Sequence, residues 1–299
     1  MWHLIVNPVA GRGRSLRQLE RVRVSLEQKG LAHQVHLTEA PGHAAHIAAA
    51  LPEDASLLAL GGDGTLHEVA SACIRTGRTL GVIPGGSGDD FAWALGLGRR
   101  APEAALAHSL SGHVLEVDTA TVDGTPFINA LGTGFDAQVA HNFALAPRVL
   151  RARAAYLYTV AATLRTLECQ RVSVTVDGSP FYSGPALLAS VQNGPRTGGS
   201  FTFAPDASLT DGRLDVVIAG HVGVRNVLNL LPNVLRGARL DHPHIHQIQG
   251  KHVVIEWEEA VAAHMEGQLL GARRRFEVEA VPRSLRVLRQ PLAESSTRR

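Results

Sequence analysis

The sequence predicts two domains: an N-terminal α/β domain with a parallel sheet covered by helices on both faces, and a mainly antiparallel C-terminal β-sandwich. In the first third of the chain, short apolar strands alternate with helical segments, a pattern typical of βα units. After about residue 115, short alternating segments are separated by Gly, Pro, Asp and Asn turns, which favours antiparallel strands. We therefore expect an α/β domain over 1–118, to which 283–299 returns, and a β domain over 119–282.

Composition agrees with a globular protein. The chain has 299 residues, of which 45% are apolar and 19% charged, enough for two cores. Its net charge of +2 gives no electrostatic reason to expect a nucleic-acid partner. Cys73 and Cys169 fit no metal or redox spacing and suggest free thiols in a reducing compartment. The chain enters a strand at once, leaving no room for a signal peptide, and no apolar stretch is long enough for a bilayer. We expect a cytoplasmic protein.

Four buried strands and three helices are expected in the first domain. Ser15 is a candidate N-cap for the first helix, and Thr65 for the third. Parallel strands end at the same edge of a sheet, where ligands of such folds bind. The expected strands are 3–6, 34–37, 57–60 and 80–83, and the expected helices are 16–29, 41–50 and 66–76.

The turn after the third strand carries the strongest local signal. Gly61, Gly62 and Gly64 remove Cβ atoms where a polyphosphate could approach the main chain, and the following helix offers free N–H groups. Asp63 would repel a bare phosphate, so its presence indicates a nucleotide with Mg²⁺. An ordinary tight βα turn is the alternative.

Two further turns have the same character. The loop from Asn7 to Ser15 is rich in Gly and Arg, and the loop from Pro84 to Asp90 carries three glycines and two carboxylates. Because all three turns follow strands of one parallel sheet, we expect them to meet over a single hollow.

The second half is predicted to contain strands and two helices. The role of 148–167 stays open, because this segment could lie on a membrane surface or pack on the β domain. The alternating His242, His244 and His246 suggest a solvated loop rather than a metal site. The tail 294–299 looks disordered. The expected strands are 114–122, 127–131, 172–176, 186–191, 214–218, 252–256, 275–279 and 284–288, and the expected helices are 148–167 and 224–236.

Taken in order, these motifs resemble the diacylglycerol kinase catalytic-domain family, and within it the bacterial soluble lipid kinases related to sphingosine kinases. The Gly-Gly-Asp-Gly-Thr turn also occurs in NAD kinases, but the later blocks favour lipid kinases. The motifs are Asn7-Pro8 with Gly11, Gly61 to Thr65, Pro84 to Ala92, Asn129 to Asp136, and Asp211-Gly212-Arg213-Leu214-Asp215.

The resemblance implies ATP and Mg²⁺ as cofactors, with ATP in the cleft between the two domains. Asp63, Asp90 and Asp118 would hold the catalytic Mg²⁺. A second, structural Mg²⁺ would be held by Asp211 and the carbonyl groups of Ser208 and Arg213. The residues implied to contact ATP are Asn7, Thr38, Gly61, Gly62, Asp63, Gly64, Thr65, Leu66, His67, Gly86 and Ser87.

The chain departs from the family pattern at its expected base. The family has Asp-Gly-Glu where this chain has Glu266-Gly267-Gln268, and Gln cannot accept a proton at neutral pH. Either Glu266 substitutes from the same face of a strand, or Asp63 transfers the proton, or the enzyme is slow. Asp89 also stands where the family usually has Asn, and Trp93 where it has a basic residue.

We therefore expect a lipid kinase that transfers the γ-phosphate of ATP to a hydroxyl of a membrane lipid such as diacylglycerol, at the inner face of the membrane. The alternatives are another lipid acceptor, a catalytically weak or inactive nucleotide- or lipid-binding protein, and an NAD kinase-like enzyme. The sequence leaves the acceptor and the oligomeric state open, a homodimer included.

Overall fold

The structure is a computed structural model that describes residues 1–98, 100–144, 159, 162–163 and 169–290. The chain forms two compact units. Unit 1 comprises Met1–Val117 and the chain from Arg283, and unit 2 comprises Asp118–Pro282. Two strands continue from one unit into the other along the chain, β5 (Val114–Val122) and β16 (Gln268–Leu288).

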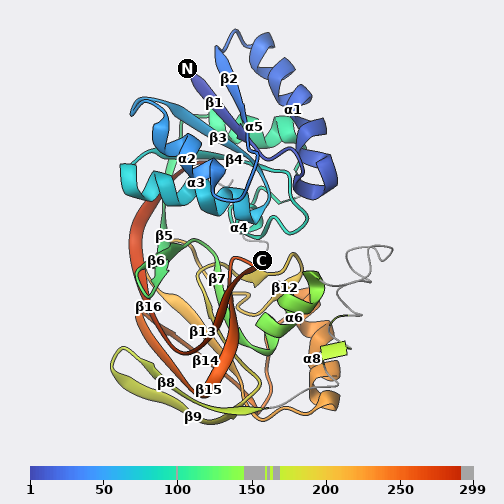
Figure 1. Ribbon diagram of the computed structural model, residues 1–299, viewed down its shortest axis with the longest axis vertical. Helices are drawn as coiled ribbons and strands as arrows, with labels where there is room; N and C mark the ends of the chain where they lie inside the picture. The colour runs from blue at the N-terminus through green and yellow to red at the C-terminus, as the bar shows by residue number, and fades with distance from the viewer. Residues whose placement is uncertain (99, 145–158, 160–161, 164–168, 291–299) are drawn as a thin grey trace, which may run out of the picture. The chain divides into compact units, whose positions relative to one another are not determined.

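Unit 1 is built on a parallel sheet in the order β2-β1-β3-β4, and the end of β16 adds a further parallel strand beside β4. The helices form two pairs, α1 with α5 and α2 with α3 (Figure 1). The elements are β1 (Trp2–Val6), α1 (Ala10–Gln28), β2 (His33–Leu37), α2 (His43–Ala50), β3 (Ser56–Gly61), α3 (Asp63–Thr76), β4 (Thr79–Pro84), α4 (Asp90–Ala94) and α5 (Pro102–Leu110).

The central strands of this sheet are buried on both faces, as their uninterrupted apolar sequences predict. One face of the sheet packs against α1 and α5. Successive side chains of each strand point alternately to this face and to the opposite face of the sheet, as the pleat requires. The core on this face includes Leu4, Val6, Leu58, Leu60 and Ile83 from the strands and Leu19, Val22, Leu26 and Leu106 from the helices. The predicted α/β class of the first domain is confirmed.

The predicted helix caps were wrong. The Ser15 hydroxyl donates to the Asn7 carbonyl instead of accepting a helical N–H group. Helix α3 begins at Asp63, two residues before Thr65, with Gly62 as its N-cap. Residues 11–13 adopt left-handed backbone angles, so the regular part of α1 begins only after this turn. Both hydroxyls pair with Asn7 instead, because Ser15 donates to its carbonyl and Thr65 accepts from its side-chain amide.

Unit 2 is mainly antiparallel, which confirms the predicted class of the second domain. Strands pair in the order β14-β13-β10-β7-β15-β16, and β9 pairs with β8, which pairs with the first half of β15. Its further elements are β6 (Thr125–Phe127), β7 (Ala130–Gly134), α6 (Phe135–Ala144), β8 (Gln170–Val176), β9 (Ser179–Ala186), β10 (Leu188–Gln192), β11 (Arg196–Thr197), β12 (Phe201–Thr202), β13 (Leu214–Ala219), α8 (Val224–Arg236), β14 (Ile245–Gly250) and β15 (His252–Met265).

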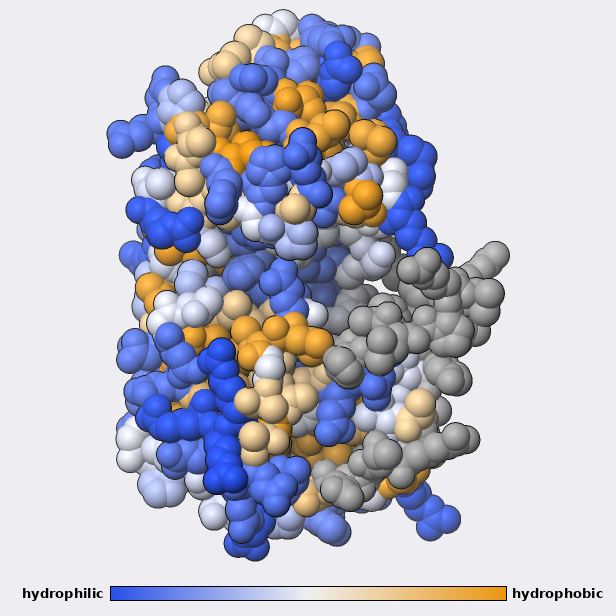
Figure 2. Space-filling view, in the orientation of Figure 1, coloured by the Kyte–Doolittle hydropathy of each residue, from blue (hydrophilic) through white to orange (hydrophobic). Residues whose placement is uncertain are grey.

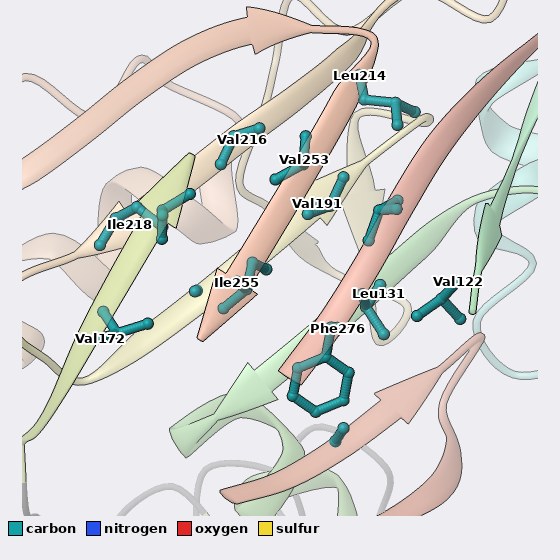
Figure 3. Packing of buried hydrophobic residues seen from close by; sticks show 14 of the residues in the cluster. Val122, Leu131, Val172, Val191, Leu214, Val216, Ile218, Val253, Ile255 and Phe276 are labelled. Carbon is teal, nitrogen blue, oxygen red and sulfur yellow. The ribbon is translucent and has the colours of Figure 1, made fainter. Parts of the chain in front are cut away.

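Strand β15 pairs with β8 along its first half and with β7 along its second half, because its register shifts in the middle. Its first half pairs with β8 through Val253–Trp257, and its second half pairs with β7 through Ala263–Met265, with a register shift between Glu256 and Val261. A bulge of this kind lets one strand bend and change neighbours. The apolar side chains of these strands enclose the core in Figure 3, where Leu131, Ile255 and Phe276 lie among the valines of the surrounding strands.

Other expectations for unit 2 had mixed outcomes. Helix α8 matches the predicted 224–236. The predicted strand 127–131 is divided between β6 and β7, and β15 and β16 are much longer than expected. Of the His242–His246 stretch, only 245–246 belong to a strand. The stretch 148–167 lies almost wholly outside the described residues, and the tail 294–299 lies entirely outside them.

The described part of the chain contains no helix with the length and apolar character needed to cross a bilayer. Figure 2 shows hydrophilic side chains over most of one face, with hydrophobic ones in small groups between them.

A histidine pair on the sheet of unit 1 predicts sensitivity to acid. His3 Nδ1 lies 3.0 Å from His36 Nε2, so one neutral ring donates to the other. Burial lowers the pKa of both side chains, and the neighbouring His36 lowers that of His3 further. Below about pH 6.5 the unfolded chain therefore binds protons that the folded chain excludes, and stability falls as the pH drops toward the folded-state pKa values.

We expect the urea midpoint of the wild type to fall between pH 7 and pH 5, and His36→Gln to flatten that dependence. Equal slopes for the two proteins would contradict this assignment. Both proteins keep the other histidines, including His108, whose pKa burial also lowers, so the difference between the two slopes isolates the pair.

Candidate active site

The strand register of unit 1 brings the ends of four strands to one edge. Val6 pairs with both Leu37 and Leu60, and Leu60 also pairs with Ile83. The residues that follow these positions are the ones singled out from the sequence. Asn7 and Thr38 donate backbone N–H groups to the Leu60 and Val6 carbonyls, so the predicted residues on neighbouring strands lie side by side.

The three glycine-rich corners meet at this edge. A Cβ atom on Gly62 would lie 3.1 Å from Gly86 Cα, and one on Gly86 would overlap Gly62 Cα. A Cβ on Gly11 would likewise overlap the Gly85 carbonyl oxygen. The backbones can approach this closely only because these residues have no side chain. The predicted meeting of the corners is therefore observed within unit 1.

Asp63 connects the second corner to the third. Its Oδ1 atom accepts hydrogen bonds from the backbone N–H groups of Asp90, at 2.6 Å, and Phe91, at 3.4 Å. Asp90 is buried at the start of α4, and Asp63 is half-buried at the start of α3. Asp63 and Asp90, two residues predicted to bind the metal, are thus in contact at the starts of two helices.

The other predicted nucleotide residues of unit 1 lie on the same corners and on the first turn of α3. Asn7 Nδ2 donates to the hydroxyl of Thr65, 3.1 Å away, which links the first corner to α3. Leu66 is buried in α3, whereas His67 is half-buried on it. Ser87 is exposed at the tip of the third corner.

Asp89, the departure from the family's Asn, has its own partners. Its Oδ2 atom forms an ion pair with Arg14 at 3.0 Å, and its Oδ1 atom accepts the Gly86 N–H at 2.7 Å. Burial raises the pKa of the Asp89 carboxyl, while the Gly86 N–H and Arg14 act in the opposite direction. Its backbone is left-handed (φ 54°), a conformation that Asn and Asp tolerate better than most residues. The negative charge that Asp89 adds is therefore compensated by an ion pair with Arg14, a residue that the sequence reasoning did not single out.

The other predicted metal ligands lie in unit 2. Asp118 is buried, and its Oδ2 atom accepts the Gly212 N–H at 2.6 Å. Asp211 Oδ1 accepts the Arg213 N–H at 3.0 Å, closing the Asp-Gly turn around itself. Ser208, three residues before Asp211, is half-buried and contacts Thr210. The Asp118 carboxylate is therefore hydrogen-bonded to the turn at Asp211 and Gly212, where the second metal site is predicted.

Glu266 does not share a strand face with Gln268, the arrangement that one of the three alternatives for the base required. Glu266 and Gly267 form a two-residue hairpin turn between the paired Met265 and Gln268, and both turn residues have positive φ. This is the two-residue turn that antiparallel strands prefer. Gln268 is exposed on the far side of the turn.

The Glu266 carboxylate binds backbone instead. Its Oε1 atom accepts the N–H groups of Ile128, Asn129 and Ala130, at 3.0, 2.6 and 3.3 Å. Ile128 and Asn129 lie between β6 and β7, and Ala130 is the first residue of β7, so the bonds to Glu266 explain why the predicted single strand is interrupted there. Asn193 continues this polar cluster by donating to the carbonyls of Asp118 and Ile128. Sequence reasoning did not single out Asn193, although the Asn193-Gly194 dipeptide is a turn signal that could have drawn attention to it.

Unit 2 also contains an apolar cavity with one acidic group. Asp136 is the only charged side chain among the described residues that line it. Neither of its carboxylate oxygens has a hydrogen-bond partner within the described part of the chain, and Oδ2 lies 3.4 Å from Nε2 of the buried His264. Apolar lining residues include Phe135, Val139, Leu187, Phe201, Leu231 and Val234.

The α/β unit and the antiparallel β unit have the NAD kinase-like fold, and comparison with known proteins gives the family. Residues 1–122 match the diacylglycerol kinase catalytic domain, and residues 129–289 match the YegS C-terminal NAD kinase beta sandwich-like domain. The chain belongs to the diacylglycerol kinase family with a YegS-type C-terminal domain, whose members are ATP-dependent lipid kinases.

Individual relatives cover nearly the whole chain. It is 31% identical to a diacylglycerol kinase of Bacillus subtilis, over 90% of this chain and 89% of that protein. It is 26% identical to a diacylglycerol kinase of Mycobacterium tuberculosis H37Rv, over 95% and 94%. A crystal structure of a diacylglycerol kinase from Bacillus anthracis shares the fold with a TM-score of 0.76 at 24% identity, over 97% of both chains. An NAD kinase of Archaeoglobus fulgidus in complex with ATP shares it with a TM-score of 0.52 at 11% identity, over 97% and 94%.

Proposed function

We propose that this lipid kinase phosphorylates a hydroxyl of a membrane lipid, with diacylglycerol or a close relative as the acceptor. The observation that carries the proposal is the apolar cavity of unit 2, which the buried Asp136 lines. Its Oδ2 atom faces His264, and neither carboxylate oxygen has a hydrogen bond within the described part of the chain. Burying such a group without hydrogen bonds is costly, and a donor from a ligand would offset that cost. An acyl chain suits the apolar lining, and a hydroxyl suits Asp136.

The nucleotide is proposed to bind at the carboxyl edge of unit 1. Glycines let the three corners meet without side chains that would block a phosphate, and the start of α3 adds its dipole. Asn7, Thr38, the Gly61–His67 segment, Gly86 and Ser87 are assigned to ATP on this basis. Phosphoryl transfer depends mainly on positioning and charge neutralisation, which such a corner supplies.

We assign the catalytic Mg²⁺ to Asp63, Asp90 and Asp118, and a structural Mg²⁺ to Asp211 with the carbonyls of Ser208 and Arg213. These are hard oxygen donors, the ligands that Mg²⁺ prefers. When bound, the catalytic ion supplies charge neutralisation for the phosphates. Asp63 is fixed by the Asp90 and Phe91 N–H groups, so its carboxylate is oriented before any ligand arrives.

Glu266 is proposed to be an anchor for the chain between β6 and β7 rather than the base, because one of its oxygens already accepts three N–H groups. We expect Glu266→Gln, which keeps that acceptor oxygen, to retain kcat within a few-fold, and Glu266→Ala to lower the free energy of unfolding by about 1–3 kcal/mol. A base would instead lose roughly 10²–10⁴-fold in kcat on conversion to Gln. Steady-state kinetics and urea unfolding of both variants decide between the two roles, with Gln268→Ala as the neighbouring control.

The acceptor is tested by transfer of labelled phosphate from ATP into a mixed lipid extract, with pure diacylglycerol and NAD as separate acceptors. We expect a labelled lipid product, strongest with diacylglycerol, and none with NAD. Labelling of NAD alone would overturn the lipid assignment, and ATP binding without any transfer would indicate an inactive member. Phosphorylation of the lipid when it is presented in anionic vesicles would support action at the inner face of the membrane.

A further inference from the structure

The paired strands β15 and β16 of unit 2 carry a histidine and two glutamates on one outward face. His252 lies directly opposite Glu279, and Glu277 lies one diagonal position away, opposite Val254. Residues two apart on a strand share a face, so all three side chains project from the same side of the pair. One ligand atom from each lies within 4.8 Å of the other two.

The backbone beneath this group is anchored in the core of unit 2. The alternate residues Val253 and Val278 point the other way into the core of unit 2 and are fully buried. His252 and Glu277 are each 38% exposed, so a hydrated ion can reach them. The site therefore combines a fixed frame with access to solvent.

Charge favours a cation here. Glu277 and Glu279 face one imidazole, and Glu279 has no ion pair within the described part of the chain. Arg275 Nη1 binds Glu277 Oε2 at 2.8 Å, which leaves Oε1 directed at His252 Nε2, 3.0 Å away. A partner of this kind orients a metal ligand from outside the coordination shell.

We propose that His252, Glu277 and Glu279 form a binding site for a divalent transition metal, Zn²⁺ in particular, that links β15 to β16. One imidazole nitrogen and two carboxylate oxygens are a ligand set that Zn²⁺ accepts, with water completing the coordination. The hard ions Mg²⁺ and Ca²⁺ prefer oxygen ligands only, so the imidazole selects against them. In this role Nε2 of neutral His252 binds the metal in place of its hydrogen bond to Glu277.

The full chain, freed of metal with a chelator, is titrated with Zn²⁺ by calorimetry and in thermal melts, with Mg²⁺ as the reference ion. We expect saturable Zn²⁺ binding that raises Tm, a loss of at least tenfold in affinity for Glu279→Gln, and no measurable binding at this site for His252→Gln. Gln at 252 can still donate to Glu277, so this variant removes the metal ligand and keeps the strand contact.

His242→Gln serves as the matched control, because His242 belongs to the other histidine-rich segment. It is expected to bind Zn²⁺ as the wild type does. The proposal is overturned if the wild type shows no saturable uptake, if the His252→Gln/Glu279→Gln double variant takes up as much Zn²⁺ as the wild type, or if uptake is lost in His242→Gln. None of these readouts depends on kinase activity, so failure of the metal-site proposal can be distinguished from failure of the proposed function.

Discussion

Replacing Asp63 with Asn is expected to lower kcat by roughly 10²–10³-fold while leaving the fold intact. Asn keeps an oxygen that can accept the Asp90 and Phe91 N–H groups, so the link between α3 and α4 persists. What it removes is the negative charge proposed to hold the metal beside the phosphates. The measurement is the initial rate of lipid phosphorylation at saturating ATP and Mg²⁺, together with the thermal melt.

Asp89→Asn is the matched control for this charge. It lies in the third corner, next to Asp90, whose N–H group Asp63 binds. Its charge is compensated by Arg14, and Asn is the residue that the family resemblance suggests there. We expect it to keep a rate within about tenfold of the wild type. A similar loss in both variants would mean that the general charge of the corner matters rather than a metal ligand at Asp63, and a rate for Asp63→Asn close to wild type would remove Asp63 from the mechanism.

Adding one methyl group at Gly86 is expected to abolish detectable binding of ATP with Mg²⁺ and to lower the stability of unit 1 by about 1–3 kcal/mol. The backbone angles of Gly86 are not in the left-handed region, so Ala is permitted there conformationally. The new Cβ would overlap Gly62 Cα, however, and a backbone atom cannot move aside as a flexible side chain can. The two corners would separate, and the proposed phosphate site would be lost.

Calorimetry with ATP and Mg²⁺ and thermal unfolding test this expectation, with Gly223→Ala as the control. Gly223 has an ordinary φ of −83°, and a Cβ atom there would meet nothing within 4 Å. Wild-type nucleotide affinity in Gly86→Ala would show that the meeting of the corners is not needed for binding.

The sequence by itself determined the fold class and the place of the proposed nucleotide site. Apolar strands followed by glycine turns have a local signature, and parallel strands necessarily end at one edge. The convergence of Gly11, Gly62 and Gly86 at that edge follows from these two facts together.

Only the tertiary structure decided the partners of the charged side chains. Arg14 is 75 residues from Asp89, and Glu266 is more than 130 residues from the three N–H groups that it binds. Nothing in the local pattern distinguishes such an anchor from a base, because both are carboxylates in a turn beside glycine. The reason is physical: propensity and periodicity are local properties, whereas hydrogen-bond satisfaction depends on which distant backbone groups the folded strands bring within reach.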